Sequence, residues 1–151
     1  MASFASFKEP VDEVYLIALG HALYCFIRLE RMAVACVQKI AEKSYNPKLT
    51  RHYVETVSAK TAIQIAGDFM AAADGMTDVG LKRVMKSAAD RFRALAKRRN
   101  DLVHASPGTA LNGDQRLFCN GSEWTTSDIE DLAAKFAKCT DILRDLHSKV
   151  L

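Results

Sequence analysis

The sequence predicts an all-α protein, an up-and-down four-helix bundle with a small β-hairpin between the third and fourth helices. In four segments, apolar residues recur at the three- and four-residue spacing of amphipathic helices. Between the last two segments, two short runs flank Asn120-Gly121, the dipeptide that best suits a tight two-residue hairpin. Each helix has one apolar stripe to bury, and a bundle buries four such stripes most economically.

The first two helices are predicted by their periodicity and by the residues that end them. The first covers residues 12–43 and is broken by residues 44–47, while the second covers residues 53–73 and ends at Gly75. The apolar stripe of the first helix is expected to contain Val14, Ile17, His21, Tyr24, Cys25, Met32, Cys36 and Ile40.

The third and fourth helices are predicted with their caps. Thr77 caps the third helix, which ends where Pro107 and Gly108 forbid continuation, and Ser127 with Glu130 forms a capping box for the fourth. The stripe of the third helix is expected to contain Leu81, Val84, Met85, Ala88, Phe92, Leu95, Leu102 and Val103.

The length and composition predict one globular domain over residues 1–151, with residues 1–10 flexible. The longest apolar runs are six residues long, residues 32–37 among them, and are too short to span a bilayer, and the N-terminus lacks the pattern of an export signal. The four cysteines are widely spaced and form no CxxC pair. We therefore expect a cytoplasmic protein.

Positive charge is concentrated in one part of the chain. Residues 81–104 contain eight Lys or Arg residues against two Asp, although the net charge of the whole chain is only +3. Such a concentration is expected of a surface that meets an anion.

Within this basic segment, Arg99, Asn100 and His104 lie close to the predicted end of the third helix. The helix dipole at a C-terminus favours the imidazolium, which suits a histidine for proton donation near neutral pH. An arginine offers a permanent, bidentate donor to phosphate oxygens. The simpler interpretation also stands: a basic last turn complements the dipole, and His104 caps exposed carbonyls.

The run Arg99-Asn-Asp-Leu-Val-His104 resembles the signature of the HEPN superfamily, which is an Arg, a polar residue and a closing His near the end of a bundle helix. The resemblance implies metal-independent RNA cleavage at a composite site formed by two protomers, by attack of a ribose 2′-OH on the adjacent phosphate. It implies that Arg99 binds phosphate, that His104 is the general acid or base, and that Asn100 orients either His104 or the phosphate. Arg98 is the alternative arginine.

The same resemblance implies a toxin or an antiphage-defence effector, with an antitoxin or another defence-system protein as a partner. Some HEPN toxins carry a Tyr two residues after the His, which their antitoxin modifies. Here Ser106 occupies that position, so the resemblance does not extend to regulation by tyrosine modification.

Three neighbouring cations, Arg98, Lys97 and Arg93, are candidates for RNA contacts through phosphate, or else form a solvated helix face. Trp124 and Phe118 in the hairpin either stack on an unpaired base or pin the hairpin to the core. No cofactor or metal is expected, because the His21 and Cys25 pair lacks a second pair with ligand spacing.

Two functions without catalysis remain open from the sequence. One is a HEPN-like module that binds RNA, a nucleotide or a protein through the same basic surface. The other is a helical adaptor that dimerises through its long first helix. We expect a homodimer in the enzymatic case as well.

Overall fold

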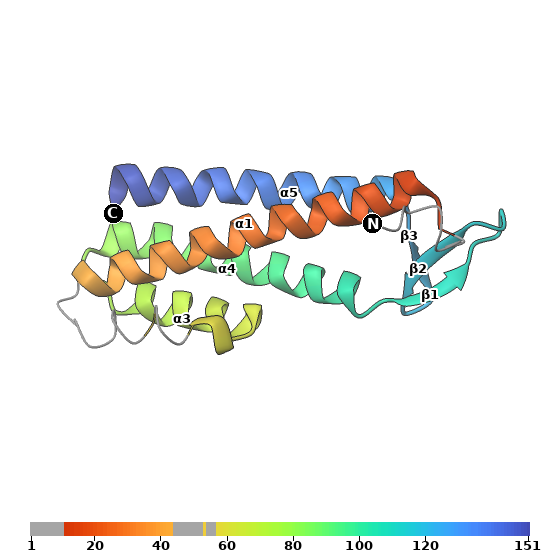
Figure 1. Ribbon diagram of the computed structural model, residues 1–151. Helices are drawn as coiled ribbons and strands as arrows, with labels where there is room; N and C mark the ends of the chain where they lie inside the picture. The colour runs from red at the N-terminus through yellow and green to blue at the C-terminus, as the bar shows by residue number, and fades with distance from the viewer. Residues whose placement is uncertain (1–10, 44–52, 54–56) are drawn as a thin grey trace.

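The computed structural model describes residues 11–43, 53 and 57–151, so the expected flexibility of residues 1–10 concerns residues outside this part of the chain. Long helices dominate the described residues, and a small sheet lies at one end of them (Figure 1). The four helices are α1 (Glu13–Lys43), α3 (Ala62–Asp74), α4 (Val79–Val103) and α5 (Thr126–Asp145), with short turns η2 (Val57–Ala59) and η3 (Leu146–Val150). No described helix is both long enough and apolar enough to cross a membrane.

The sheet lies between α4 and α5 in the sequence and has three antiparallel strands in the order β1-β2-β3. These strands are β1 (Ser106–Thr109), β2 (Gln115–Cys119) and β3 (Ser122–Trp124). Asn120 and Gly121 join β2 to β3 with φ angles of 52° and 80°, the positive values that a tight hairpin turn requires. The predicted hairpin is therefore confirmed, and β1 is an addition to it.

Strand β1 was not predicted because Pro107 and Gly108 were interpreted only as a helix stop. In the structure they pair with Leu117 and Arg116 of β2. A proline is tolerated there because β1 is an edge strand. A Cβ atom on Gly108 would lie 2.8 Å from the Phe118 ring, so the glycine allows that ring to lie against the strand.

The helices do not alternate in direction as a strict up-and-down bundle would. The colours of Figure 1 show α1, α3 and α5 running one way and α4 the other. The ion pair between Lys86 and Asp74, at 2.9 Å, joins α4 to the end of α3 across their short connection. The second helix also begins later than predicted, at Ala62, because Thr61 caps it and forms a capping box with Gln64.

Two other helices begin one or two residues away from their predicted caps. The side chain of Asp78, not Thr77, accepts a hydrogen bond from the Leu81 N–H at the start of α4. Thr125 and Asp128 form the capping box of α5, in place of Ser127 and Glu130. Both observed caps satisfy the same requirement for a side-chain acceptor before the first helical turn.

Phe26 of α1 lies at the centre of the core. Its ring centroid is 6.2 Å from that of Phe92 in α4 and 5.1 Å from that of Phe136 in α5. The predicted stripe of α1 is partly wrong in its first half, since Val14, Ile17 and Tyr24 are 63%, 69% and 61% exposed. The buried residues there are Tyr15, Ala18, Ala22, Cys25 and Phe26.

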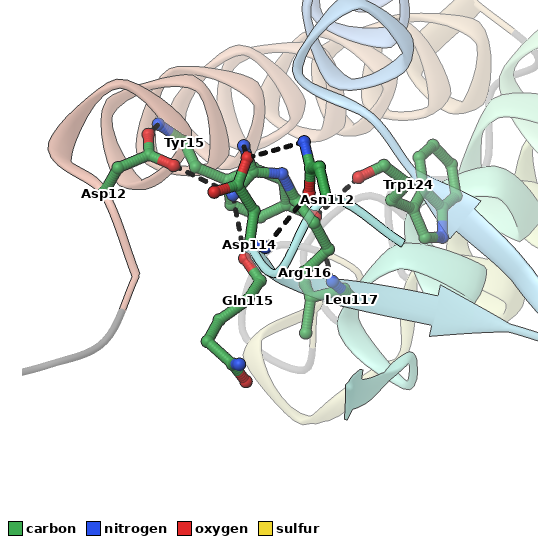
Figure 2. Close-up of polar contacts among 8 residues, drawn as sticks. All are labelled: Asp12, Tyr15, Asn112, Asp114, Gln115, Arg116, Leu117 and Trp124. Atoms are coloured by element: carbon green, nitrogen blue, oxygen red, sulfur yellow. Dashed lines mark hydrogen bonds and ion pairs between the residues drawn. The ribbon is translucent and has the colours of Figure 1, made fainter. Parts of the chain in front are cut away.

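Tyr15 joins the start of α1 to the sheet (Figure 2). Its hydroxyl donates to the carbonyl oxygen of Trp124 at 2.7 Å and accepts from the N–H of Leu117 at 3.0 Å. Strands β2 and β3 are thus both bonded to one buried side chain. Because a buried polar group without a partner is costly, this pair of bonds fixes where the sheet sits on the bundle.

Arg116 completes this anchor from the side of β2. Its guanidinium lies 4.4 Å from the centre of the Tyr15 ring and donates to the Asp12 carboxylate at 2.8 Å. It also donates to Asp114 at 3.3 Å and to the carbonyl oxygen of Gln115 at 2.8 Å. The guanidinium lowers the pKa of Asp12, although the hydrogen bond from the Tyr15 N–H is the larger cause.

We expect Tyr15→Phe to lower the free energy of unfolding by about 1–3 kcal/mol, because it leaves a buried carbonyl and a buried N–H without their partner. Urea denaturation measures this value. Tyr53→Phe is the matched control, since it removes a buried tyrosine hydroxyl that has no hydrogen-bond partner among the described residues. Equal stability of the two variants would contradict the anchoring role.

Candidate functional site

His104 lies at the end of α4, where the chain leaves the bundle for the sheet. It is the C-cap residue, and its backbone N–H donates to the carbonyl oxygen of Asn100 at 2.9 Å. Its side chain is exposed, and β1 begins two residues later at Ser106. Because the sheet is bonded to Tyr15, the point at which α4 ends is held in place together with the sheet.

Three of the predicted site residues share one face of α4 with His104. Arg93, Lys97, Asn100 and His104 are spaced at i, i+4, i+7 and i+11, which places them along one side of a helix. We call these four residues the basic stripe. Asn100 is half-buried and the other three are exposed, and neither Arg93 nor Lys97 has an ion-pair partner among the described residues.

Arg99 faces α1 and not the basic stripe. Its guanidinium carbon lies 4.8 Å from the centre of the Phe26 ring, which is the geometry of a cation–π contact. Its Nε is buried and has no hydrogen-bond partner within the described part of the chain. Arg99 is thus half-buried, with one donor unsatisfied.

Glu30 lies one helical turn beyond Phe26 on α1, in the surroundings of Arg99. Burial raises the pKa of Glu30, and the positive charges of Arg99 and then Arg31 partly oppose that rise. No ion pair within 4.0 Å links Glu30 to Arg99 among the described contacts. The carboxylate therefore acts on the arginine through space and leaves its donors free.

Tyr53 is the other buried polar residue close to Glu30. Burial raises the pKa of its phenol, and the carboxylates of Asp68 and Glu30 add to the effect. Its hydroxyl has no hydrogen-bond partner in the part of the chain that the structure describes. The Tyr53 hydroxyl and the Arg99 Nε are thus two buried polar atoms near Glu30 without hydrogen-bond partners among the described residues. Such unpaired atoms are unusual in a folded interior.

Arg98 lies on a different side of α4 from His104. Its guanidinium is 4.6 Å from the Trp124 indole of β3, and it forms an ion pair with Asp101 at 3.8 Å. The structure therefore brings neither arginine into contact with His104: Arg98 lies against Trp124 and Arg99 lies against Phe26.

The two aromatic residues of the hairpin pack onto the protein. Trp124 is only 4% exposed and belongs to the core, so its ring is not accessible to an RNA base. Phe118 is half-buried against Gly108. Of the two interpretations offered by the sequence, pinning of the hairpin to the core is the one that fits Trp124.

His21 and Cys25 touch, with 3.5 Å between His21 Nε2 and Cys25 Sγ. Within the described ranges, no three His, Cys, Asp or Glu residues are grouped as metal ligands would be. The side chains that accompany His104 on the basic stripe are an amide, an ammonium group and a guanidinium group.

Sequence reasoning missed the surroundings of Arg99. Phe26 was not assigned to the apolar stripe of the first helix, and Glu30, four residues later, was not placed near Arg99. Their spacing at i, i+4 shows that they share a face, but nothing in the sequence indicates that this face meets Arg99, some seventy residues later.

We expect Arg99→Gln to raise the pKa of Glu30 further, because it removes the larger of the two positive charges that oppose the effect of burial. Arg31→Gln is the matched control and should raise this pKa by less. Carboxyl NMR titration measures both values. If Glu30 titrates identically with and without the Arg99 charge, the guanidinium does not face Glu30.

Comparison of the chain with protein-family models, with curated proteins and with solved structures finds no match. The function must therefore be inferred from the residues around His104 and from their surroundings.

Proposed function

We propose that the protein is a metal-independent endoribonuclease of the HEPN type, which acts as a homodimer in the cytoplasm. The observation that carries this proposal is the position of His104, an exposed imidazole at the end of α4, on the basic stripe. The stripe's two cations lack carboxylate partners among the described residues and are free to meet phosphates.

The reaction needs only proton transfers and stabilisation of charge on phosphate. A ribose 2′-OH loses its proton and attacks the adjacent phosphorus, while the 5′-oxygen of the next nucleotide leaves with a proton. The products are a 2′,3′-cyclic phosphate and a 5′-hydroxyl. His104 supplies one of the two proton transfers, and the His104 of a second protomer supplies the other.

In this proposal Arg99 binds the phosphate, and Asn100 orients the reacting groups. The guanidinium of Arg99 rests against Phe26 and has no ion pair among the described contacts, so a bound phosphate does not have to displace a carboxylate from it. Asn100 lies one turn before His104 and orients either the imidazole or the phosphate. Arg93 and Lys97 extend the contact to neighbouring phosphates of the RNA backbone.

The homodimer is supported by the first half of α1. Val14, Ile17 and Tyr24 are exposed there, at spacings of three and seven residues that place them on one face of the helix. An apolar stripe that a protein leaves uncovered is typical of an interface. A second copy of the chain has the same stripe on its α1, so the two stripes can pack against each other.

One observation favours an alternative without catalysis. Arg99 is half-buried against Phe26, as an arginine with a structural role would be. In that alternative the basic stripe binds RNA, a nucleotide or a partner protein, such as an antitoxin or a defence-system component, and His104 transfers no proton. RNA that is bound but left intact is the result that this alternative predicts.

We expect purified protein to cleave single-stranded RNA in the presence of EDTA and to leave 2′,3′-cyclic phosphate ends. His104→Ala should reduce cleavage by about 10²–10⁴-fold, the usual contribution of general acid–base catalysis. Arg99→Ala should reduce cleavage strongly as well. Gel analysis of end-labelled RNA with mapped ends measures these effects.

The control for His104→Ala is His147→Ala, which removes a half-buried histidine of η3 that belongs neither to the basic stripe nor to the exposed face of α1. This variant should cleave RNA as the wild type does. If wild type, His104→Ala and Arg99→Ala give the same low cleavage, the protein is not a ribonuclease of this kind.

We expect Ile17→Asp to convert the dimer to a monomer, because it places a charge in the exposed stripe of α1. Light scattering coupled to size-exclusion chromatography measures the mass. Val79→Asp is the matched control, since Val79 is also highly exposed but lies at the start of α4. A wild-type monomer, or a dimer that survives Ile17→Asp, would contradict this interface.

A further inference from the structure

A groove of about 390 Å³ runs between α4 and α5, outside the site around His104. Its floor is aliphatic, and two arginines and a serine of α4 lie along its edge. The lining residues are Arg83, Val84, Ser87, Ala88, Arg91, Ile142 and Leu146. Arg91 and the stripe residue Arg93 are only two positions apart, and such positions point to different sides of a helix.

The groove exists because α4 and α5 pack chiefly against other helices. α5 lies mainly along α1, and α4 lies mainly along α3. Val84 shows the consequence, because it belongs to the apolar stripe predicted from the sequence and yet is 45% exposed. Ile142 of α5 and Leu146 of η3 are also only partly buried, so the described elements leave an aliphatic surface uncovered.

The charges at the groove are unbalanced. Neither Arg83 nor Arg91 forms an ion pair with any described residue, although both are exposed. Arg91 also lies close enough to α5 that its charge partly opposes the rise that burial causes in the pKa of the Cys139 thiol. Eight residues of helix separate the two arginines by about 12 Å, which is close to two helical turns.

We propose that this groove binds an amphipathic α-helix of a partner protein, one that carries apolar side chains on one face and two carboxylates two turns apart. The apolar face covers Val84, Ala88 and Ile142, and the carboxylates meet Arg83 and Arg91. A helix in an apolar groove is a recurring mode of recognition. The spacing of the two arginines matches that of two acidic residues on a helix lying parallel to α4.

The chemistry of the floor favours a protein helix over RNA. Single-stranded nucleic acid is held by stacking of its bases on aromatic or guanidinium planes. Of these the groove offers only the guanidinium groups of Arg83 and Arg91 at its edge, and its floor is aliphatic and contains no aromatic ring. The proposal is independent of ribonuclease activity, since it uses none of the residues of the basic stripe and neither Arg99 nor His104.

The test uses a synthetic helical peptide with leucines along one face and two glutamates two turns apart at the edge of that face. Its binding to the whole protein is followed by fluorescence anisotropy. We expect saturable binding, and at least about a tenfold loss of affinity when Arg83→Glu and Arg91→Glu are combined, because like charges then face each other. A peptide with lysines in place of the glutamates should not bind.

Arg93→Glu is the matched control, because it reverses an exposed arginine of α4 on another side of the helix and should leave peptide affinity unchanged. Absence of binding, or equal loss in the control, overturns the proposal. RNA that displaces the peptide and is itself lost in the double variant indicates a nucleic-acid groove instead. If Val84→Asp turns a dimer into a monomer, the groove is an interface between copies of the chain. The RNA result and the Val84→Asp result each overturn the proposal as well.

Discussion

The two hydrogen bonds of the Tyr15 hydroxyl hold the sheet to the bundle, and the position of the candidate site depends on them. They join the first turn of α1 to β2 and β3, which lie about a hundred residues later in the chain. The sheet begins two residues after His104, so whatever fixes the sheet also fixes the end of α4. A contact made by α1 thereby helps to determine where the imidazole at the end of the basic stripe is presented.

The positive side chains of α4 lie on several sides of the helix, and each side has different neighbours. Arg93 and Lys97 lie with His104 on the basic stripe, Arg99 turns inward to Phe26, and Arg98 stacks on Trp124. Because successive residues of a helix are about 100° apart, a cluster of cations in sequence becomes several separate surfaces in space. The charge of this segment is visible in the sequence, but its division among surfaces with different neighbours is visible only in the structure.

The sequence predicted the secondary-structure elements well, but it predicted less well which elements pair or pack with one another. Periodicity located the long helices, and Asn120-Gly121 located the hairpin, because both signals are local. Strand β1 escaped detection because Pro107 and Gly108 are equally typical of a loop, and only pairing with β2 makes them a strand. The direction of α3 depends on how the preceding connection is routed, which no local pattern records.

Within the helices, the sequence pattern likewise did not determine which apolar residues are buried. Val14, Ile17 and Val84 fit the apolar spacing as well as the buried residues do, but no element of the described protomer covers them. The motif around His104 was found because it is contiguous in sequence. The half-buried setting of Arg99 was not, because Phe26 and Glu30 come from another helix.

The setting of Arg99 is compatible with phosphate binding when the magnitudes are compared. A cation–π contact contributes about 0.5–1 kcal/mol at an exposed site and about 2 kcal/mol when desolvated. A hydrogen bond to a charged group contributes about 1.5–3 kcal/mol, and an unsatisfied buried donor costs about 1–3 kcal/mol. Arg99 has the contact with Phe26 and bears the cost of its buried Nε, so a phosphate that reaches the guanidinium offers more than the ring does. On these magnitudes, the contact with Phe26 is too weak to prevent the phosphate binding that we propose for Arg99.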